Sequence, residues 1–158
     1  MRRKEREITD KTALEAVIRD TFHVTMAMPT SGVPYMLPMN FGYENGIVYL
    51  HCARAGKKLD ILRAADGRLP VSLLFVSKAS LLDKGKGIIC GLSARYASVV
   101  ATGMLEEVTD NDERLRGLRS VVRQVGVEDR PFTDGDLAAV IVLRVTISDM
   151  IGKMNDPA

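Results

Sequence analysis

Apolar and polar residues alternate along most of the chain, and this pattern predicts a protein built mainly from β-strands. The expected strands, about six in number, are Phe22–Met28, Val33–Phe41, Ile47–Cys52, Pro70–Val76, Ala94–Val108 and Ala138–Ile147. Asn45 and Gly46 join the second and third of these, and an Asn-Gly pair between apolar runs is a strong hairpin signal. Short connections and few helices favour an antiparallel sheet closed into a small barrel over a doubly wound parallel sheet.

Two of the expected helices follow the usual rules for helix ends. Thr12-x-x-Glu15 is a capping-box pattern and predicts a short helix near the N-terminus. A longer helix is expected after Thr109, with acidic residues in its first turn and arginines late, as the helix dipole favours. Its apolar stripe consists of Leu115, Leu118, Val122 and Val125. The segments Ser77–Ser93 and Asp129–Asp136 are expected to be loops.

Two strands carry residues that interrupt a regular ladder. Val33–Phe41 contains Pro34 and Pro38, which have no N–H to donate, so this segment is expected to be an edge or bulged strand. Backbone groups that such a strand leaves unpaired are available to hold a ligand. In the long strand, Gly103 is expected to mark a bulge where a barrel turns a corner.

The third expected helix, Lys57–Asp66, has an unusual start. The preceding residues Ala53–Gly56 offer no Ser, Thr, Asp or Asn to cap its free N–H groups. Lys57 and Lys58 face the positive end of the helix dipole, where a cation normally costs roughly 0.3–1 kcal/mol. A phosphate at this end would cap the N–H groups and pair with both lysines, which predicts a ligand that carries phosphate. The alternative is two solvated lysines on a surface turn, and spacing alone does not separate the two.

Composition places the chain among ordinary globular proteins. Its 158 residues fit one domain, 1–158, with 46% hydrophobic and 27% charged residues. The charged leader, residues 1–8, needs no fixed structure and leads into no apolar signal segment, and no apolar run is long enough to span a membrane. A net charge of +2 gives no reason to expect nucleic acid. Two cysteines at this spacing fit neither a disulfide framework nor a zinc site. We therefore expect a cytoplasmic protein without a metal centre.

His51 is the candidate for chemistry. It stands a few residues before the expected phosphate site, where it could donate a hydrogen bond or a proton to a ligand. A Cys/His nucleophile pair with Cys52 is not expected, because neighbours in a strand point to opposite faces. Arg95 and Tyr96 offer a guanidinium and a phenol at the start of the long strand. The alternatives are a structural histidine at a barrel end and an ordinary exposed strand start.

Two segments resemble a known family. The sequences PYMLPMNFGY (34–43) and YLHCARAGKK (49–58) are similar to the FMN-binding split-barrel proteins related to pyridoxamine 5′-phosphate oxidase, in particular the nitroimidazole-resistance proteins. The charged start Arg2–Ile8 and the end Ile151–Lys153 also match that branch. The resemblance covers almost the whole chain.

The resemblance implies a six-stranded antiparallel split barrel with flanking helices, and a homodimer that holds FMN in the clefts between its protomers. It implies a phosphate at Gly56, Lys57 and Lys58, with Cys52 beside it and His51, the catalytic candidate, near the flavin. The ring system would lie along the main chain of Met36, Leu37, Pro38, Met39 and Asn40. The partner chain would contribute Arg95, Tyr96 and Ser98.

The leading hypothesis is therefore an FMN-dependent oxidoreductase acting on a small acceptor such as a nitroaromatic compound. A pyridoxamine-phosphate oxidase proper is less favoured, because a second phosphate would need its own basic cluster. The alternative is a non-catalytic flavin- or haem-binding protein of the same fold. Haem would be favoured if His51 faced an open hydrophobic slot without a phosphate contact.

Overall fold

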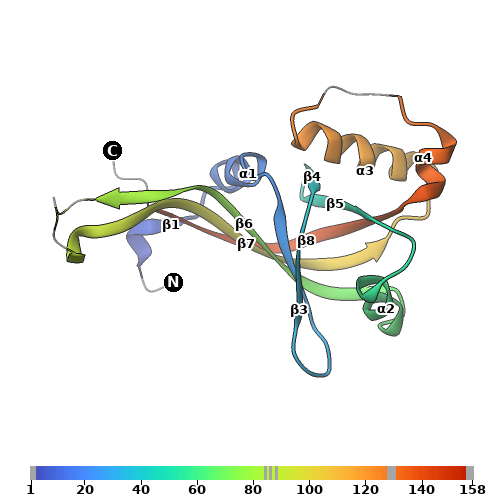
Figure 1. The fold of residues 1–158 in the computed structure, drawn as a ribbon, viewed down its shortest axis with the longest axis horizontal. Helices are drawn as coiled ribbons and strands as arrows, with labels where there is room; N and C mark the ends of the chain where they lie inside the picture. The colour runs from blue at the N-terminus through green and yellow to red at the C-terminus, as the bar shows by residue number, and fades with distance from the viewer. Residues whose placement is uncertain (1–2, 84, 86, 88, 128–130, 156–158) are drawn as a thin grey trace.

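The computed structural model describes residues 3–83, 85, 87, 89–127 and 131–155, and its main feature is one antiparallel sheet (Figure 1). The strands are β1 (Glu7–Ile8), β2 (Val24–Met28), β3 (Tyr35–Met39), β4 (Phe41–Glu44), β5 (Ile47–Cys52), β6 (Arg68–Asp83), β7 (Leu92–Glu107) and β8 (Ile141–Asn155). Their order across the sheet is β3-β2-β6-β7-β8-β5-β4, with β1 paired to β8. The antiparallel, mainly β fold expected from the sequence is confirmed.

The sheet closes on itself because its two end strands are joined directly. Only Asn40 separates β3 from β4, so the chain passes from one end of the strand order to the other. If β3 and β4 are counted as one bent strand, the sheet contains the six strands expected from the sequence and, in addition, the short β1. The position of β3 at the end of the order confirms the edge strand that Pro34 and Pro38 predicted. The expected bulge is present as well, as a register shift between Thr102 and Gly103 where β7 pairs with β8.

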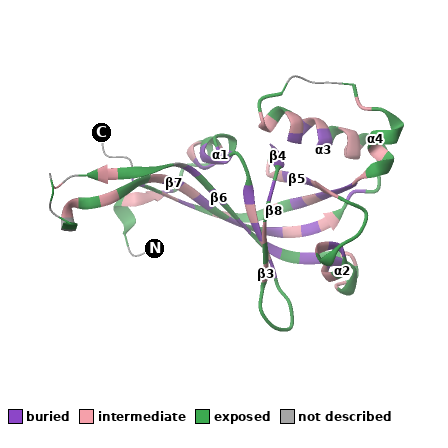
Figure 2. Ribbon diagram, viewed as in Figure 1, coloured by how far each residue is buried: buried purple, intermediate pink, exposed green. Residues whose placement is uncertain are grey.

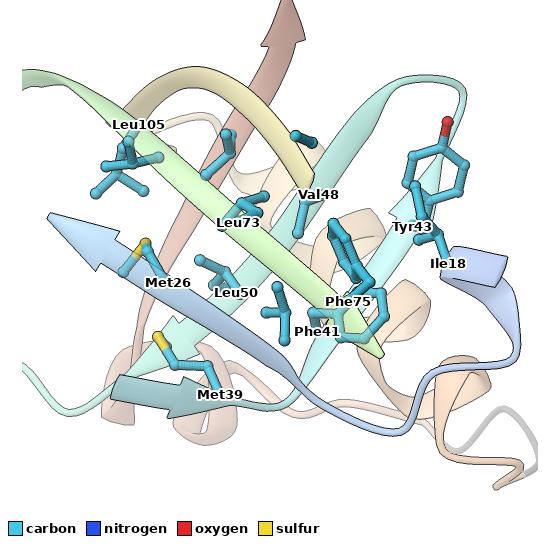
Figure 3. Packing of buried hydrophobic residues seen from close by; sticks show 14 of the residues in the cluster. Ile18, Met26, Met39, Phe41, Tyr43, Val48, Leu50, Leu73, Phe75 and Leu105 are labelled. Atoms are coloured by element: carbon cyan, nitrogen blue, oxygen red, sulfur yellow. The ribbon is translucent and has the colours of Figure 1, made fainter. Parts of the chain in front are cut away.

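The inner face of the sheet holds the main hydrophobic core (Figure 3). Phe41 and Phe75 meet edge to face within this core, with ring centroids 5.2 Å apart. Strand β5 serves two cores, because its side chains alternate between the two faces of the sheet. Val48 and Leu50 face the barrel, whereas Tyr49 belongs to a second cluster beneath a helix.

The helices are η1 (Lys4–Arg6), α1 (Lys11–Arg19), α2 (Lys57–Ala64), η2 (Ile89–Gly91), α3 (Asn111–Gln124) and α4 (Asp134–Ala139). The capping box expected at Thr12 is wrong. Asp10 caps α1 by accepting a hydrogen bond from the Ala13 N–H at 2.8 Å. Glu15 instead accepts hydrogen bonds from Tyr43 and Arg19, at 2.9 Å each. Tertiary contacts and an equally good cap two residues earlier thus displaced the expected motif.

The stripe expected on α3 is only partly correct. Asp110 caps this helix by accepting from the Glu113 N–H at 2.9 Å, so the helix begins at Asn111. Its buried residues are Gly117, Leu118, Ser120 and Val121. Of the expected stripe, Leu118 alone is fully buried; Leu115, Val122 and Val125 are half-buried. The helix is rotated toward its small residues because these allow it to lie close against β4 and β5.

Both expected loops contain regular structure. Within Ser77–Ser93, β6 continues to Asp83 and β7 begins at Leu92, so the two strands pair as a ribbon beyond the barrel (Figure 1). The burial pattern explains the error, because the ribbon is largely exposed on both faces and has no apolar alternation to detect (Figure 2). Asp129–Asp136 includes the start of α4, which Thr133 and Asp136 begin with a capping box. Asp129 itself lies outside the described residues.

The charged leader is ordered where the structure describes it. After the turn η1, Glu7 pairs with Lys153 and Ile8 with Gly152 as the strand β1. Ile8 is buried in the main core, beside Leu14 of α1. The expectation that residues 3–8 need no fixed structure is therefore wrong, because one apolar side chain among six charged neighbours anchors the segment.

Candidate functional site

The start of α2 is an uncapped helix end that opens to solvent. Gly56 stands at the N-cap with φ 125° and ψ 164°, and no side chain caps the helix there. A positive φ of this kind is comfortable only for glycine. Space remains around it, because a Cβ at Gly56 would meet no atom within 4 Å. The N–H groups of the first turn therefore face an open corner, although Asp60 adds one acidic group to that turn.

The two lysines of this corner lie against strands on its two sides. The Lys57 ammonium is 4.8 Å from the ring centroid of Tyr35 on β3, a cation–π contact. Lys58 lies near the Cys52 thiol on β5, close enough for its charge to act on this group. Burial raises the pKa of this thiol, and the positive charge of Lys58 opposes the rise only in part, so Cys52 stays protonated near neutral pH. Gly56, Lys57, Lys58 and Cys52 are thus brought together as the sequence predicted.

The Tyr35 contact also brings β3 to this corner. Along β3, Leu37 and Met39 pack on the main core, whereas Met36, Pro38 and the adjoining Asn40 are exposed. Among the described strands β3 pairs only with β2, so its other edge keeps main-chain groups without a strand partner. The segment predicted to carry a ring system is therefore a neighbour of the predicted phosphate site.

His51 lies on the opposite face of β5 from Cys52. Its Nδ1 is buried, and none of the described residues forms a hydrogen bond with that atom. Burial lowers the pKa of His51, and the charge of Lys58 lowers it further, so the imidazole is neutral near pH 7. The ring lines a cavity of about 360 Å³. The other lining residues are Leu118, Val121, Val122, Pro131, Phe132, Asp136, Ala139 and Val140.

Sequence reasoning missed this cavity, because its described walls come from β5, α3, α4 and the two residues Pro131 and Phe132. The only local signal was the Thr133-x-x-Asp136 capping box that starts α4. The contact that fixes α4 against α3 is made by Arg114, which donates hydrogen bonds to the carbonyls of Leu137 and Val140, the latter at 3.2 Å. A pairing between residues this far apart in the chain leaves no pattern in the sequence.

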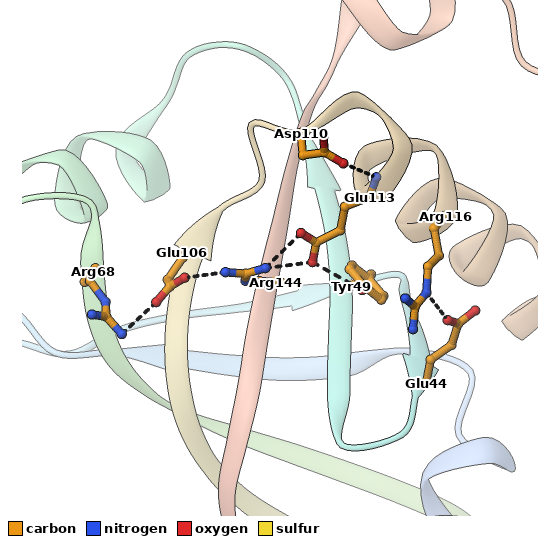
Figure 4. Close-up of polar contacts among 8 residues, drawn as sticks. All are labelled: Glu44, Tyr49, Arg68, Glu106, Asp110, Glu113, Arg116 and Arg144. Carbon is orange, nitrogen blue, oxygen red and sulfur yellow. Dashed lines mark hydrogen bonds and ion pairs between the residues drawn. The ribbon is translucent and has the colours of Figure 1, made fainter.

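A second missed feature is a row of charged contacts that holds α3 on the sheet (Figure 4). Arg144 of β8 lies between two carboxylates, donating to Glu113 at 2.8 Å and to Glu106 at 3.0 Å. Arg68 contacts the other oxygen of Glu106 at 2.8 Å. Tyr49, beneath α3, donates to Glu113 at 3.4 Å. These half-exposed contacts fix the orientation of α3 more than they add to stability, and so they keep the wall of the cavity in place.

Arg95, Tyr96 and Ser98 lie at the other end of β7. Arg68 of β6 and Glu106 of β7 are paired at one end of these two long strands, and their side chains are 2.8 Å apart. This end lies near α2, because α2 directly precedes β6 in the chain. Arg95 is about 35 Å from Glu106 along β7, at roughly 3.3 Å per residue. Arg95 and Tyr96 line a different pocket, against α1, and the Lys153 ammonium lies 5.8 Å from the Tyr96 ring centroid. A single chain therefore does not bring these three residues to α2.

The family of this chain follows from a match over nearly its whole length. The model of the pyridoxamine 5′-phosphate oxidase family matches residues 10–154. The chain belongs to the pyridoxamine 5′-phosphate oxidase family. This confirms the resemblance seen in residues 34–43 and 49–58, which contain both β3 and the start of α2. Comparison with curated proteins gives no match.

Solved structures with this fold bear names that refer to several cofactors. A candidate 5-nitroimidazole antibiotic resistance protein from Bacteroides thetaiotaomicron is 28% identical, with a TM-score of 0.80 over 93% of this chain and 85% of that one. The flavocytochrome Anf3 from Azotobacter vinelandii is 20% identical, with a TM-score of 0.81 over 99% of this chain and 72% of that one. An FAD- and haem-binding protein from Mycobacterium smegmatis is 21% identical, with a TM-score of 0.78 over 96% and 74%. At the lower identities the likeness shows the fold alone.

Two further observations concern membrane spans and metal ligands in the part of the chain that the structure describes. No helix in the described ranges is both long and apolar enough to cross a membrane. Within the same ranges, no three side chains of His, Cys, Asp or Glu come together as metal ligands would.

Proposed function

We propose that this protein is an FMN-dependent oxidoreductase that reduces small acceptors. The observation that carries the proposal is the corner at α2, where an uncapped helix start, open space and two lysines lie together. A phosphate seated there would accept hydrogen bonds from the free N–H groups and pair with Lys57 and Lys58. The free edge of β3 beside it, with the adjoining Asn40 (Met36–Asn40), would lie along the ring system.

The residues of the chain would bind and orient the cofactor, and FMN when bound would supply the electron-transfer chemistry. Lys57 and Lys58 would hold the phosphate, with Cys52 behind Lys58. The main chain of β3 would offer hydrogen bonds to the ring edge, apart from Pro38, which has no N–H. His51, neutral near pH 7, could donate or accept one hydrogen bond toward an acceptor molecule.

We further propose a homodimer in which each cleft takes α2 from one chain and the start of β7 from its partner. The support is the separation of Arg95, Tyr96 and Ser98 from α2 within one chain. An exposed apolar row across the outer face of the sheet is consistent with such an interface. The row is formed by Leu74, Val100 and Ile151, which pair across β6, β7 and β8 and are 38%, 44% and 39% exposed.

Nitroaromatic compounds are the proposed acceptors, supported by the 28% identity to the candidate nitroimidazole resistance protein. A substrate with its own phosphate, such as pyridoxamine phosphate, is less suitable. The cavity beside His51 has no Lys or Arg among its described lining residues, so a second phosphate would lack a partner there.

Haem does not fit the residues present. His51 does face an apolar cavity, as a haem ligand would. A histidine that ligates a metal, however, almost always donates its other ring N–H to a fixed acceptor. His51 Nδ1 has no such acceptor in the part of the chain that the structure describes. We therefore favour flavin.

The proposal is tested by comparing FMN with riboflavin, which has the same ring system and no phosphate. We expect FMN to quench its fluorescence on titration into the purified protein, with riboflavin binding at least about a hundredfold more weakly because it cannot pair with the lysines. Equal affinity for FMN and riboflavin would mean that the phosphate does not contact the lysines, and it would contradict the proposed phosphate site. No binding of either would remove the flavin proposal.

A mixing experiment tests the shared cleft. Lys57→Ala/Lys58→Ala and Arg95→Ala/Tyr96→Ala are each expected to bind FMN weakly as pure proteins. After unfolding and refolding together, mixed dimers would hold one intact cleft each, so about a quarter of all clefts should regain wild-type affinity. Recovery is expected to be absent when either variant is refolded alone. If the mixture recovers no sites, the two sets of residues do not share a cleft.

A further inference from the structure

The short helix α4 is a small unit with little buried surface. None of its residues is fully buried, and Leu137 alone is half-buried, against the cluster beneath α3. Its N-terminal end is closed by its own capping box, in which Thr133 and Asp136 bind each other. A segment with so few buried contacts opens more easily than the core does. The position of α4 over the sheet (Figure 1) therefore depends on the few side chains that hold it.

Two arginines hold the C-terminal end of α4 from different parts of the fold. Arg114 of α3 donates to the carbonyls of Leu137 and Val140. Arg54 donates from Nη1 to the carbonyl of Ala138, at 2.9 Å. Cations suit this end of a helix, because its last carbonyls have no partner within the helix. The Arg114 contact ties α4 to its neighbouring helix, whereas the Arg54 contact ties it to the segment between β5 and α2.

Arg54 belongs to the loop that forms the phosphate corner. This loop, Ala53–Gly56, is exposed at every residue and ends at the N-cap of α2. Arg54 stands three positions before Lys57. Within the described chain, the side chain of Arg54 makes a single hydrogen bond, the one to Ala138. That bond therefore joins the phosphate corner to α4.

The contact and the corner restrict the same loop, so each should strengthen the other. A phosphate that accepts hydrogen bonds from the first turn of α2 would fix the loop at Gly56. Arg54 would then lose less conformational freedom when it binds the Ala138 carbonyl. Conversely, the bond to Ala138 fixes the loop in advance and lowers the ordering cost of phosphate binding. Thermodynamic linkage requires the two effects to be equal in size.

We propose that Arg54 is a positioning residue that couples the phosphate corner to α4, so that a bound phosphate tightens α4 over the cavity beside His51. The inference rests on the proposed function, because its trigger is the phosphate of the flavin. It adds to that function a means of enclosing the acceptor. Asp136 and Ala139 of α4 and the adjoining Val140 line the cavity, so tightening of α4 fixes one of its walls.

The test measures hydrogen exchange of the α4 backbone amides with two probes, FMN and inorganic phosphate. Each is expected to slow this exchange when bound, FMN by roughly three- to tenfold, because one hydrogen bond to a charged group carries the coupling. Chloride at the same ionic strength is expected to leave it unchanged. An equal effect of chloride and phosphate would overturn the proposal, since it would show a response to salt and not to a seated phosphate.

Two arginine variants form a matched pair. Arg54→Ala is expected to speed exchange in α4 without any ligand, to abolish the response to FMN, and to weaken FMN binding by the same three- to tenfold. Arg63 is also exposed and lies in the last turn of α2, so Arg63→Ala removes the same charge from the same neighbourhood. It is expected to keep the response of α4 to FMN. Loss of the response in both variants, or in neither, would overturn the proposal.

A conservative variant separates coupling from a general effect on stability. Arg54→Lys keeps a donor of similar length, so it is expected to restore part of the response of α4 that Arg54→Ala loses. The midpoint of urea unfolding is expected to be the same in wild type, Arg54→Ala and Arg54→Lys, because the contact is exposed. A lower midpoint in Arg54→Ala that accounts for the faster exchange would overturn the proposal.

The outcomes distinguish this proposal from the flavin proposal. If FMN binds to the wild-type protein and exchange in α4 does not change, the coupling is wrong and the flavin proposal stands. If FMN fails to bind but inorganic phosphate slows exchange in α4, the flavin proposal is wrong and the coupling stands. If neither probe binds or changes exchange, both are wrong.

Discussion

Replacing Lys57 and Lys58 together with alanine is expected to weaken FMN binding by at least about a hundredfold. Each charge-assisted hydrogen bond to phosphate contributes about 1.5–3 kcal/mol, and the variant removes those of both ammonium groups. The free N–H groups of the first turn of α2 remain in this variant, and their hydrogen bonds to the phosphate would retain part of the affinity for FMN. Flavin fluorescence titration at constant ionic strength measures the change.

The same double variant should fold as well as the wild type. It loses the contact of Lys57 with the Tyr35 ring, worth about 0.5–1 kcal/mol at an exposed site. It also removes two cations from the positive end of the helix dipole, a gain of about 0.3–1 kcal/mol each. The two effects offset one another, so urea unfolding should change by less than about 1 kcal/mol.

A variant with the same change in net charge serves as the control. Lys4 and Lys11 are exposed and lie in η1 and at the start of α1, away from α2. Lys4→Ala/Lys11→Ala is expected to leave FMN affinity within about twofold. An equal loss in both double variants would mean that overall charge, and not a seated phosphate, governs FMN binding. Unchanged affinity in the Lys57/Lys58 variant would remove the phosphate from this corner.

Gly42→Ala is expected to destabilise the protein by about 3 kcal/mol, the largest effect of a single methyl group that we predict. Gly42 lies in β4 beneath α3, and a Cβ there would stand 2.3 Å from the backbone carbon of Ser120 and 2.4 Å from the Val121 nitrogen. These are backbone atoms of a helix, so the clash cannot be relieved by a rotamer change. α3 would have to move off the sheet, lowering the melting temperature by roughly 6–12 °C.

Gly32→Ala is the matched control for this prediction. Gly32 is exposed, and a Cβ there would meet no atom within 4 Å. Its replacement should change the free energy of unfolding by less than about 1 kcal/mol, toward higher stability, because alanine restricts the unfolded chain. The expected difference between the two variants arises from crowding alone. If Gly42→Ala were as stable as Gly32→Ala, the close packing of α3 on β4 would be incorrect.

Those parts of the fold that depend on neighbours in the sequence could be predicted. The hairpin at Asn45 and Gly46 is present, because its turn and both flanking strands are adjacent in the chain. The edge position of β3 followed from its prolines, which cannot donate to a ladder on either side. The corner at Gly56, Lys57 and Lys58 is also local, since one short segment supplies the helix start and both cations.

Errors at the sequence level arose where a distant contact replaced a local signal. The ribbon beyond Ser77 is largely exposed on both faces and has no regular apolar alternation, so only the pairing of β6 with β7 defines it as strand. The leader is ordered because Ile8 reaches the core beside Leu14. The capping box at Thr12 failed because Asp10 caps α1 and the distant Tyr43 donates a hydrogen bond to the carboxylate of Glu15.

The sequence by itself determined the mainly β architecture, the edge strand and the lysine-bearing helix start, because each depends on residues within about ten positions of one another. Only the tertiary structure decided that α3 and α4 cover the face of β5 that bears His51, with a cavity beneath them, and that Arg95 and Tyr96 lie far from α2 in one chain. Side-chain alternation tells which residues of β5 share a face, but not which distant elements cover that face. That choice is made by the packing of the whole chain.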